Sequence, residues 1–537
     1  MLVAPYTNMK KTFNLVSIMA TLLLHLTATA QQPYDILLKN GKIIDGTGNS
    51  WYIADIAVQN GVIKRIQKNI TAAAIHTIDA TGLIVAPGFI DVHTHIEGDE
   101  TKTPTADNFI YDGVTTVVAG NCGISNVDIQ KYLSWVDSFG LSVNVASLVG
   151  HNDVRKAVMG RANRFANETE LQQMEALVKK AMQGGAVGIS TGLIYIPGTY
   201  SNTAEVVRLA KAAAQYNGVY ATHMRDEGDS VTQAIEEALY IGRQANIPVE
   251  ISHFKCSGQQ NWGRSKQTIS LIIDARKQGL DVTIDQYPYT AGSTSLGTLL
   301  PDDILADGQD SVIARLNRTA DKNKAIAYMM KKLKRRGLKH YSYAVVAYYK
   351  PDTSLNGKSI EQVNLLKGKK HTARDEAETI FEMIKEGGAG MVFHGMSEAD
   401  VQYIMQYPFN MFASDASIRE FGKGNPHPRG YGTNARVLGK YVREQHVISL
   451  EEAIRRMTSL PAQKFQLKNI GLLKEGMNAD IVLFDEAAVT DLSTFDKPHQ
   501  YSKGFKYVLV NGKLTMANEQ HTGQRAGRAI FGPGYQQ

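Results

Sequence analysis

Short apolar runs alternate with amphipathic segments through the middle of the chain, from about residue 88 to residue 469. Apolar runs of about four to eight residues between turn residues predict buried strands, and the longer amphipathic segments predict helices. One predicted helix starts at the capping-box pattern Thr169-x-x-Gln172 and stops at Gly184-Gly185, just before an apolar run. The apolar runs predicted to be strands lie at 89–92, 114–119, 141–148, 186–190, 219–222, 249–252, 281–285 and 411–414.

This alternation of strands and helices predicts an α/β fold of the TIM (β/α)8 barrel type over residues 88–469. In such a barrel the carboxyl ends of the strands carry the active site. A doubly wound sheet would not bring so many strand ends to one point. Residues from about 300 to 390 exceed what the barrel needs, and we interpret them as an insertion before the last strand that forms a lid or pocket wall.

The two ends of the chain have a different pattern, with short strands and tight turns. Turn dipeptides at Asn40-Gly41 and Asn60-Gly61 separate short apolar runs, and similar runs return near 476–485 and 507–513. We therefore expect one small β-sandwich-like domain that is built from residues 31–87 together with residues 470–537.

The first thirty residues have the pattern of a cleavable secretory signal. A basic Met9-Lys10-Lys11 precedes a mostly apolar stretch at 13–26, and the small residues Ala28-Thr29-Ala30 follow. The apolar stretch is shorter than the roughly 20 residues that a membrane span needs, and no other stretch is long enough. We expect an exported, periplasmic protein whose mature chain has no membrane span.

Composition narrows the range of partners. The chain has 537 residues, 43% of them hydrophobic, which is enough for a large core in more than one domain. The formal net charge of +6 is small for this size, and no basic–aromatic module is present, so no nucleic-acid partner is expected. We interpret the one strongly basic run, at 331–339, as the solvated face of a helix. The pattern does not fix the oligomeric state.

Residues of metal-binding type stand at the ends of several predicted strands. The run at 89–92 continues into His93-Thr94-His95, and side chains two apart on a strand share a face, about 6.5 to 7 Å apart. Taken alone, such a pair is more often structural. The other candidates at strand ends are Cys122, His223, His253 and Asp415. Imidazole, thiolate and carboxylate donors together favour zinc, so we predict a zinc site at the mouth of the barrel.

The two cysteines, Cys122 and Cys256, allow a second interpretation. In an exported protein they could form a disulfide. If Cys122 instead binds zinc as a thiolate, it is unavailable to Cys256.

A set of short motifs falls at or near the predicted strand ends. They are PGFIDVHTH (87–95), GNCG (120–123), GISTGLIY (188–195), THMRDE (222–227), ISHFK (251–255), YPYTAGST (287–294), SD (414–415) and HPR (427–429). Over nearly all of the mature chain, this set resembles the amidohydrolase superfamily, and more closely its N-acyl-D-amino-acid deacylases, the D-aminoacylases. The GNCG turn separates this branch from relatives that bridge their metals with a carbamylated lysine.

The resemblance implies roles for the metal-binding candidates. By motif, Cys122, His223 and His253 match the tight zinc ligands. His93 and His95 match a second, often weakly occupied metal position. One Zn²⁺ is therefore expected to bind tightly, with room for another.

The resemblance also implies roles in catalysis and substrate binding. Asp415 matches the carboxylate that touches the metal and acts as general base and then general acid. Lys255, Tyr287 and Arg429 match the residues that hold the substrate's α-carboxylate. His151 also lies at a predicted strand end, and we consider it either a support for the metal ligands or a substrate contact.

The predicted reaction is hydrolysis of the amide bond of N-acyl-D-amino acids by a metal-activated water. Zinc lowers the pKa of water and polarises a carbonyl, which an unreactive amide requires. Two positions depart from the common family motifs, Phe254 and Ala416, and these affect pocket shape rather than the chemistry. The alternatives are a dipeptidase acting on D-peptides, a cyclic-amide hydrolase of the same superfamily and, in another class, a non-catalytic barrel that binds metal or ligand.

Overall fold

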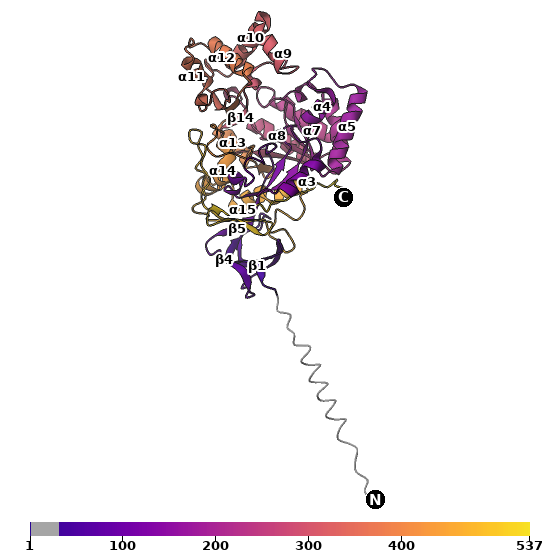
Figure 1. Cartoon of the computed structure of the whole chain (residues 1–537), viewed down its shortest axis with the longest axis vertical. Coiled ribbons are helices and arrows are strands. Elements are labelled where there is room, and N and C mark those ends of the chain that lie inside the picture. Colours follow the sequence, from indigo (N-terminus) through magenta and orange to yellow (C-terminus); the bar gives the residue numbers. More distant parts are fainter. Residues whose placement is uncertain (2–31, 537) are drawn as a thin grey trace.

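The computed structural model describes Met1 and residues 32–536 and arranges them in three regions along one long axis (Figure 1). An insertion with helices α9 to α12 lies at one end, and strands β1, β4 and β5 lie at the other. Between them lies a region of parallel strands and surrounding helices. The predicted secretory signal lies, apart from Met1, outside the described residues.

The central region is built on parallel strands that the chain visits in sequence order. Two hydrogen-bonded runs, β6-β7-β8 and β9-β10-β11-β12-β13-β17, are parallel throughout. One residue, Leu148, separates β8 from β9. On the other side, β6 and β17 are linked beyond their ends by an isolated parallel bridge between Thr94 and Ala416. The strands are β6 (Phe89–Asp91), β7 (Val114–Ala119), β8 (Asn144–Ser147), β9 (Val149–Gly150), β10 (Gly188–Gly192), β11 (Val219–His223), β12 (Val249–Ile251), β13 (Val282–Gln286) and β17 (Asn410–Phe412).

The helices of this region cover the strands with apolar faces and contribute about half of the main core cluster. They are α2 (Asp107–Ile110), α3 (Ile129–Phe139), α4 (His151–Met159), α5 (Glu168–Gln183), α6 (Thr203–Ala214), α7 (Val231–Ala245), α8 (Ser265–Lys277), α13 (Glu398–Met405), α14 (Arg429–Arg436), α15 (Leu450–Met457) and α16 (Ser459–Lys464), with the π-helical η5 (Val437–Glu444) and the short 3₁₀ helices η1 (Gly198–Tyr200) and η2 (Gln259–Asn261). Among the residues that the structure describes, no helix combines the length and apolar character that crossing a bilayer requires.

The start of helix α5 differs from the sequence prediction by a few residues. Asn167, not Thr169, caps the helix: its side chain accepts a hydrogen bond from the backbone N–H of Glu170, whose carboxylate accepts one from the N–H of Asn167. Asparagine is a strong N-cap residue and glutamate suits the third helical position, so this pair prevails and Thr169 falls within the first turn. The predicted stop at Gly184 is confirmed.

Strands from both ends of the chain form one nine-stranded sheet. Its order is β21-β20-β19-β18-β5-β1-β2-β3, with β4 paired to β1, and the antiparallel pair β18–β5 joins the two ends. The strands are β1 (Tyr34–Ile43), β2 (Tyr52–Gln59), β3 (Val62–Gln67), β4 (Ala74–Asp79), β5 (Ile84–Pro87), β18 (Ile481–Phe484), β19 (Phe505–Val510), β20 (Lys513–Ala517) and β21 (Gln520–His521).

This sheet meets the central strands at Gly88, the single residue between β5 and β6. A Cβ at Gly88 would lie 2.2 Å from Oγ1 of Thr115, so only glycine allows this approach. Beside it, the rings of Phe89, Phe484 and Phe505 pack edge to face at centroid distances of 5.9–6.4 Å. The junction thus fixes the strand that leads to His93 and His95.

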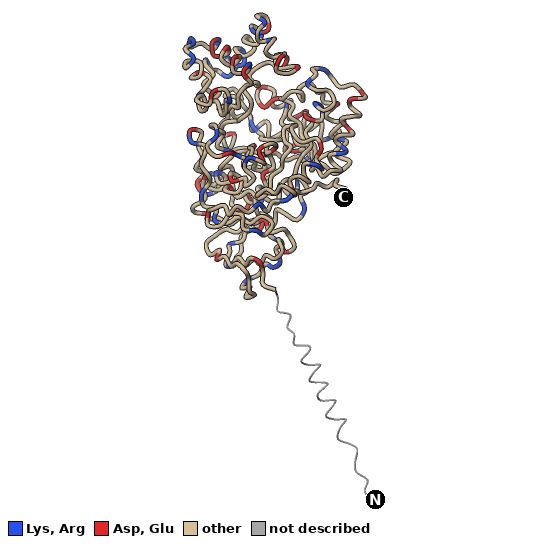
Figure 2. Tube along the Cα trace, viewed as in Figure 1, with Lys and Arg blue, Asp and Glu red and all other residues tan. Residues whose placement is uncertain are grey.

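The insertion lies between β13 and β17 and has a hydrophobic cluster of its own. A three-stranded antiparallel sheet, β14-β16-β15, connects it to the central region. Its elements are β14 (Ala291–Ser295), η3 (Leu296–Leu299), α9 (Gln309–Asn317), α10 (Thr319–Arg335), β15 (Ala344–Tyr348), η4 (Thr353–Leu355), α11 (Ile360–Leu366), α12 (Ala373–Lys385) and β16 (Gly390–His394). Basic and acidic residues are interspersed along the described part of the trace, including this insertion (Figure 2).

Candidate metal centre and active site

Six predicted ligands come together at the carboxyl ends of the parallel strands. His93 and His95 follow β6, Cys122 follows β7, His223 ends β11, His253 follows β12 and Asp415 follows β17. All are buried except His95, which is half-buried. The sequence placed these residues at strand ends, and the structure brings them into mutual contact.

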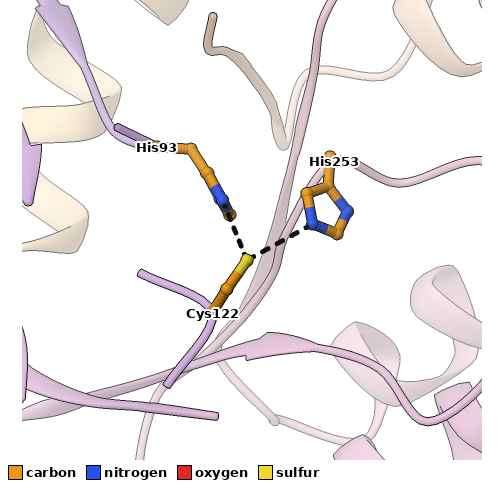
Figure 3. A group of neighbouring side chains, drawn as sticks. All are labelled: His93, Cys122 and His253. Atoms are coloured by element: carbon orange, nitrogen blue, oxygen red, sulfur yellow. Dashed lines mark hydrogen bonds between the residues drawn. The ribbon is translucent and has the colours of Figure 1, made fainter. Parts of the chain in front are cut away.

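The thiol of Cys122 lies at the middle of three imidazoles. Its Sγ is 3.3 Å from Nε2 of His93, 3.6 Å from Nδ1 of His223 and 3.7 Å from Nε2 of His253. Figure 3 shows the rings of His93 and His253 with a nitrogen turned towards the sulfur. Such a set of converging nitrogen and sulfur donors suits zinc.

Asp415 faces the other side of this group. Its Oδ1 lies 3.2 Å from Nε2 of His95 and 3.8 Å from Nε2 of His93, and its Oδ2 lies 2.9 Å from Nη1 of Arg429. His93, His95 and Asp415 thus form a second set of donors that shares His93 with the first. The arrangement offers two adjacent positions for a metal ion.

Three of these residues have a left-handed backbone conformation, which sets the direction of their side chains. The φ angles are +53° at Cys122, +38° at His253 and +48° at Asp415. This region is unfavourable for residues with a Cβ, and such strain concentrates at functional sites. In the turn before Cys122, a Cβ on Gly120 would lie 2.1 Å from the carbonyl oxygen of Leu148, so the motif requires glycine there.

Carboxylates behind the histidines orient the rings. Asp285, at the end of β13, accepts a hydrogen bond from the N–H of His253 at 2.7 Å, and its other oxygen lies 3.5 Å from Nδ1 of His93. Glu227 Oε1 lies 2.8 Å from Nδ1 of His253, which leaves Nε2 of that ring to face Cys122. A carboxylate on the far ring nitrogen is the usual support of a metal-binding histidine.

Sequence reasoning missed both of these carboxylates, although each left a signal. Asp285 is the last residue of the predicted strand 281–285, so the rule that identified the other ligands applied to it as well. Glu227 follows His223 by four residues within the THMRDE motif.

The cluster shifts the pKa values of its own members. Burial alone would raise the pKa of the Cys122 thiol, but the charge of His93 and hydrogen bonds from His223 and His253 hold it well below its usual value. Burial would likewise raise the pKa of Asp415, yet the charge of Arg429 and the hydrogen bond from His95 hold it well below its usual range. Both shifts favour the anionic form of the group.

The predicted substrate-binding residues line the same cavity, but two of them already have acidic partners. Lys255 Nζ donates to Glu227 Oε1 at 2.6 Å and to the carbonyl oxygen of His253 at 2.8 Å. Arg429 pairs with Asp415 and stacks over the ring of Tyr287 at 4.5 Å.

Arg419 is a further cation that lines this cavity, and no sequence motif indicated it. It lines the cavity and packs against Gly430, next to Arg429. Within residues 32–536 it forms no ion pair, and its buried Nε has no hydrogen-bond partner. Burial and the charge of Arg429 lower its pKa, so an anion in the cavity would relieve an unfavourable state.

The cavity has a volume of about 580 Å³, within the range of about 300 to 1,000 Å³ for small-molecule sites. The insertion supplies its outer wall through Met329, Lys332, Arg336, Tyr341 and Tyr343. The basic run at 331–339 was interpreted as a solvated face. Lys332 is exposed, but it and Arg336 also border the cavity.

Two residues singled out from the sequence lie elsewhere. His151 is buried at the start of α4, where Nε2 lies 2.9 Å from Glu205 Oε1, and it does not border the cavity. Cys256 is a free, buried thiol 3.9 Å from Oγ1 of Thr268, so the two cysteines form no disulfide.

The residues present fit a zinc ion. The nitrogens that face Sγ of Cys122 belong to three different elements, and each lies within 4 Å of a thiol whose pKa is lowered. A thiolate with imidazoles is a zinc-binding donor set, and the carboxylates of Asp285 and Glu227 complete its usual surroundings.

Comparison with known proteins gives consistent matches over most of the chain. A model described as the amidohydrolase family matches residues 76–516. A D-aminoacylase of Alcaligenes xylosoxydans xylosoxydans is 35% identical, over 93% of this chain and 98% of that protein. An N-acyl-D-aspartate deacylase of the same organism is 34% identical, over 93% and 95%.

A solved structure shows the same arrangement of the chain. It is the N-acyl-D-glutamate deacylase of Bordetella bronchiseptica, in complex with zinc and a phosphonate inhibitor that mimics the tetrahedral intermediate of its reaction. The superposition has a TM-score of 0.79 at 33% identity and covers 93% of this chain and all of the other.

Proposed function

The chain belongs to the amidohydrolase family, and we propose that it is a zinc-dependent deacylase of N-acyl-D-amino acids. The products are a carboxylate and a free D-amino acid. The observation that carries this proposal is the convergence of Cys122, four histidines and Asp415 at one end of the parallel strands, beside cations that line the same cavity. The choice of the D hand rests on the similarity to the D-specific deacylases.

We further infer that the parallel strands form a (β/α)8 barrel. In support, β6 to β17 follow one another in parallel order, and two backbone hydrogen bonds connect the segments beyond β6 and β17. They run from His95 N to Ala416 O and from Asp415 N to His93 O, both at 2.9 Å. Such a barrel explains why ligands from distant parts of the sequence meet at one end.

Cys122, His223 and His253 would hold the tight zinc ion, and His93, His95 and Asp415 a second, weaker position. When bound, zinc polarises the amide carbonyl and lowers the pKa of a neighbouring water. The protein's part is to keep these donors in place: Glu227 holds the ring of His253, and Asp285 supports His93 and the backbone of His253.

Asp415 is the proposed proton carrier. Because Arg429 keeps it ionised, its carboxylate can accept a proton from the attacking water as the new carbon–oxygen bond forms. It then donates that proton to the amide nitrogen, and the carbon–nitrogen bond breaks with release of a neutral amine. One carboxylate can serve both steps because the attacking water and the leaving nitrogen are bonded to the same carbon atom, within reach of Asp415.

We propose that the cations that line the cavity beside the metal ligands bind the substrate's α-carboxylate. Arg429, Lys255 and the hydroxyl of Tyr287 surround this position, and Arg419, which forms no ion pair within residues 32–536, lies next to Arg429. A charge-assisted hydrogen bond to a carboxylate is about twice as strong as a neutral one. Once the carboxylate is anchored, only one hand at Cα brings the acylamide to the metal ligands.

The test is an assay of the zinc-loaded full chain with paired N-acetyl-D- and N-acetyl-L-amino acids of Met, Leu, Phe, Glu and Asp, with D-dipeptides and cyclic amides alongside. We expect zinc-dependent release of the free D-amino acid and little release of the L form. Turnover of cyclic amides alone would reassign the reaction. Zinc binding without turnover of any substrate would identify a non-catalytic barrel.

The expected export of the protein is a separate proposal. It rests on the basic, apolar and small-residue pattern of the first thirty residues. Fractionation of a bacterial host followed by N-terminal sequencing tests it. A periplasmic chain beginning near Gln31 supports export, and a cytoplasmic chain that retains Met1 or Met9 contradicts it.

A further inference from the structure

Two histidines and two glutamates meet on the insertion, away from the cavity. His340 lies between α10 and β15, Glu361 in α11, His371 between α11 and α12, and Glu376 in α12. None of the four borders the cavity described above. The proposed deacylation does not use them.

These side chains present their donor atoms to one small volume. His340 Nδ1 lies 2.5 Å from Glu376 Oε1, and His371 Nε2 lies 2.6 Å from Glu361 Oε1. One such atom from each residue lies within 4.8 Å of the other three. Four ligands around a tetrahedral zinc ion at about 2.0 to 2.2 Å are separated by about 3.3 to 3.6 Å, so binding requires the side chains to close in and the stacked rings to tilt towards the ion.

The two histidine–glutamate pairs lie side by side. The rings of His340 and His371 stack with centroids 4.0 Å apart and planes at 21°. This places both carboxylates and both imidazoles around one point, so a single dication there would be shared by all four side chains.

The surroundings supply both support and access. Glu376 is fully buried, and its Oε2 accepts a hydrogen bond from the N–H of Tyr341 at 2.7 Å, which leaves Oε1 for the cluster. His371 is half exposed at the other side, so an ion can enter from solvent. A site that binds a metal ion after folding needs ligands that the protein holds in place and a path for the ion from solvent. Glu376 and His371 supply these two features.

We propose that His340, Glu361, His371 and Glu376 form a second, structural site for a divalent transition-metal ion such as zinc. The site is independent of the proposed deacylase centre and shares no residue with it. A bound ion would link α11 and α12 to the segment before β15. That segment carries Tyr341 and Tyr343, which line the outer wall of the cavity, so the ion would stiffen this wall.

The test measures zinc content by equilibrium dialysis of the full chain at buffered free Zn²⁺, followed by elemental analysis. The variants are His371→Ala and Glu361→Gln, both at partly exposed positions where folding should be preserved. The control is His76→Ala, an exposed histidine outside every cluster of metal-ligating residues. We expect the wild type and His76→Ala to bind one more zinc per chain than either cluster variant.

A second measurement separates this proposal from the proposed function. When zinc occupies the deacylase centre, Co²⁺ bound at the proposed site on the insertion should give visible absorption. This absorption should be absent in His371→Ala. Deacylation of small N-acetyl substrates should stay within about twofold in His371→Ala. Equal zinc content in all four proteins, or binding only at millimolar zinc, would overturn the inference and leave the deacylase assignment intact. A chain that binds the extra zinc but is inactive on every substrate would support the structural site and contradict the deacylase assignment.

Discussion

The chain gathers histidines and carboxylates twice, once at the strand ends and once on the insertion, and the two clusters are built differently. The strand-end donors are mostly buried, come from the ends of five strands and are backed by Asp285 and Glu227. On the insertion they come from helices and loops, and three of the four, His340, Glu361 and His371, are partly exposed to solvent. The first cluster is held by the protein, whereas the second needs an ion to hold it together.

This difference predicts how each cluster responds to the loss of a member. At the strand ends, backbone strain at Cys122, His253 and Asp415 is tolerated because the surrounding strands and carboxylates fix these positions. Removing a ligand there should abolish the chemistry without unfolding the chain. On the insertion, removing a ligand should change local order and leave the chemistry nearly unchanged.

The largest expected effect follows Cys122→Ala. The substitution removes the sulfur that three histidines face, so we expect loss of the tightly bound zinc and a fall in kcat/KM of about a thousandfold or more. Elemental analysis and the deacylase assay check this. Cys256→Ala is the matched control, because that thiol is also buried but lies outside the cluster. Equal zinc in both variants would refute the ligand assignment.

A smaller effect is expected from Asp285→Asn, which tests the support behind the ligands. The amide can still accept the hydrogen bond from the N–H of His253, but it removes the negative charge 3.5 Å from Nδ1 of His93. Losses of about 10- to 100-fold in metal affinity are typical of such changes. Competition with a chromophoric chelator measures it.

The control for this prediction is Asp281→Asn, just before the other end of the same strand, where the carboxylate contacts Lys464 instead. We expect zinc affinity to be unchanged in that variant. If Asp285→Asn also bound zinc as the wild type does, the cluster would not depend on its supporting carboxylates, and the contrast with the insertion would fail.

The same contrast explains what could be predicted from the sequence. Strand ends follow from a simple pattern, a short apolar run and then a polar residue. This pattern singled out six candidate ligands, and the structure brings their donor atoms close together. The carboxylate of Asp285 fitted the pattern and was overlooked. By contrast, His340 and His371 stand in loops of the insertion and meet through helix packing, for which no local spacing exists.

The ion-pair partners of the cations in the cavity could not be predicted from the sequence. The sequence indicated Lys255 and Arg429 as carboxylate-binding residues, but it could not show that Glu227 and Asp415 already pair with them. Nor could it show that Arg419 forms no ion pair with any other described residue, because that depends on the loop after β17. Which charge remains available is a property of the assembled cavity.

Arg419→Met tests that available charge and should have a moderate effect. A hydrogen bond to a charged group is worth about 1.5 to 3 kcal/mol, and Arg419 is partly exposed, so we expect KM to rise about tenfold with kcat little changed. The loss should be absent with the matching α-carboxamide of the substrate. Lys332→Met, which removes an exposed cation of the outer wall, should leave KM within about twofold.

An equal loss with the carboxylate and the carboxamide would mean that Arg419 supports the cavity's shape instead of binding the anion. In that case the cations paired with Glu227 and Asp415 must carry recognition of the carboxylate, and the strand-end cluster would take part in binding as well as chemistry.

The smallest expected effect distinguishes an ion-dependent cluster from a self-supporting one. A ligand at 100 times its Kd stabilises the state that binds it by about 2.7 kcal/mol. Zinc should therefore slow limited proteolysis in the segments beside His340 and His371, and only when the cluster is intact. His371→Ala should lose this protection, while His76→Ala and Cys122→Ala should keep it. Protection that persists in His371→Ala but disappears in Cys122→Ala would show that the strand-end zinc stiffens the insertion. The two clusters would then be one coupled system, because a single ion at the strand ends would order the outer wall through the cavity itself.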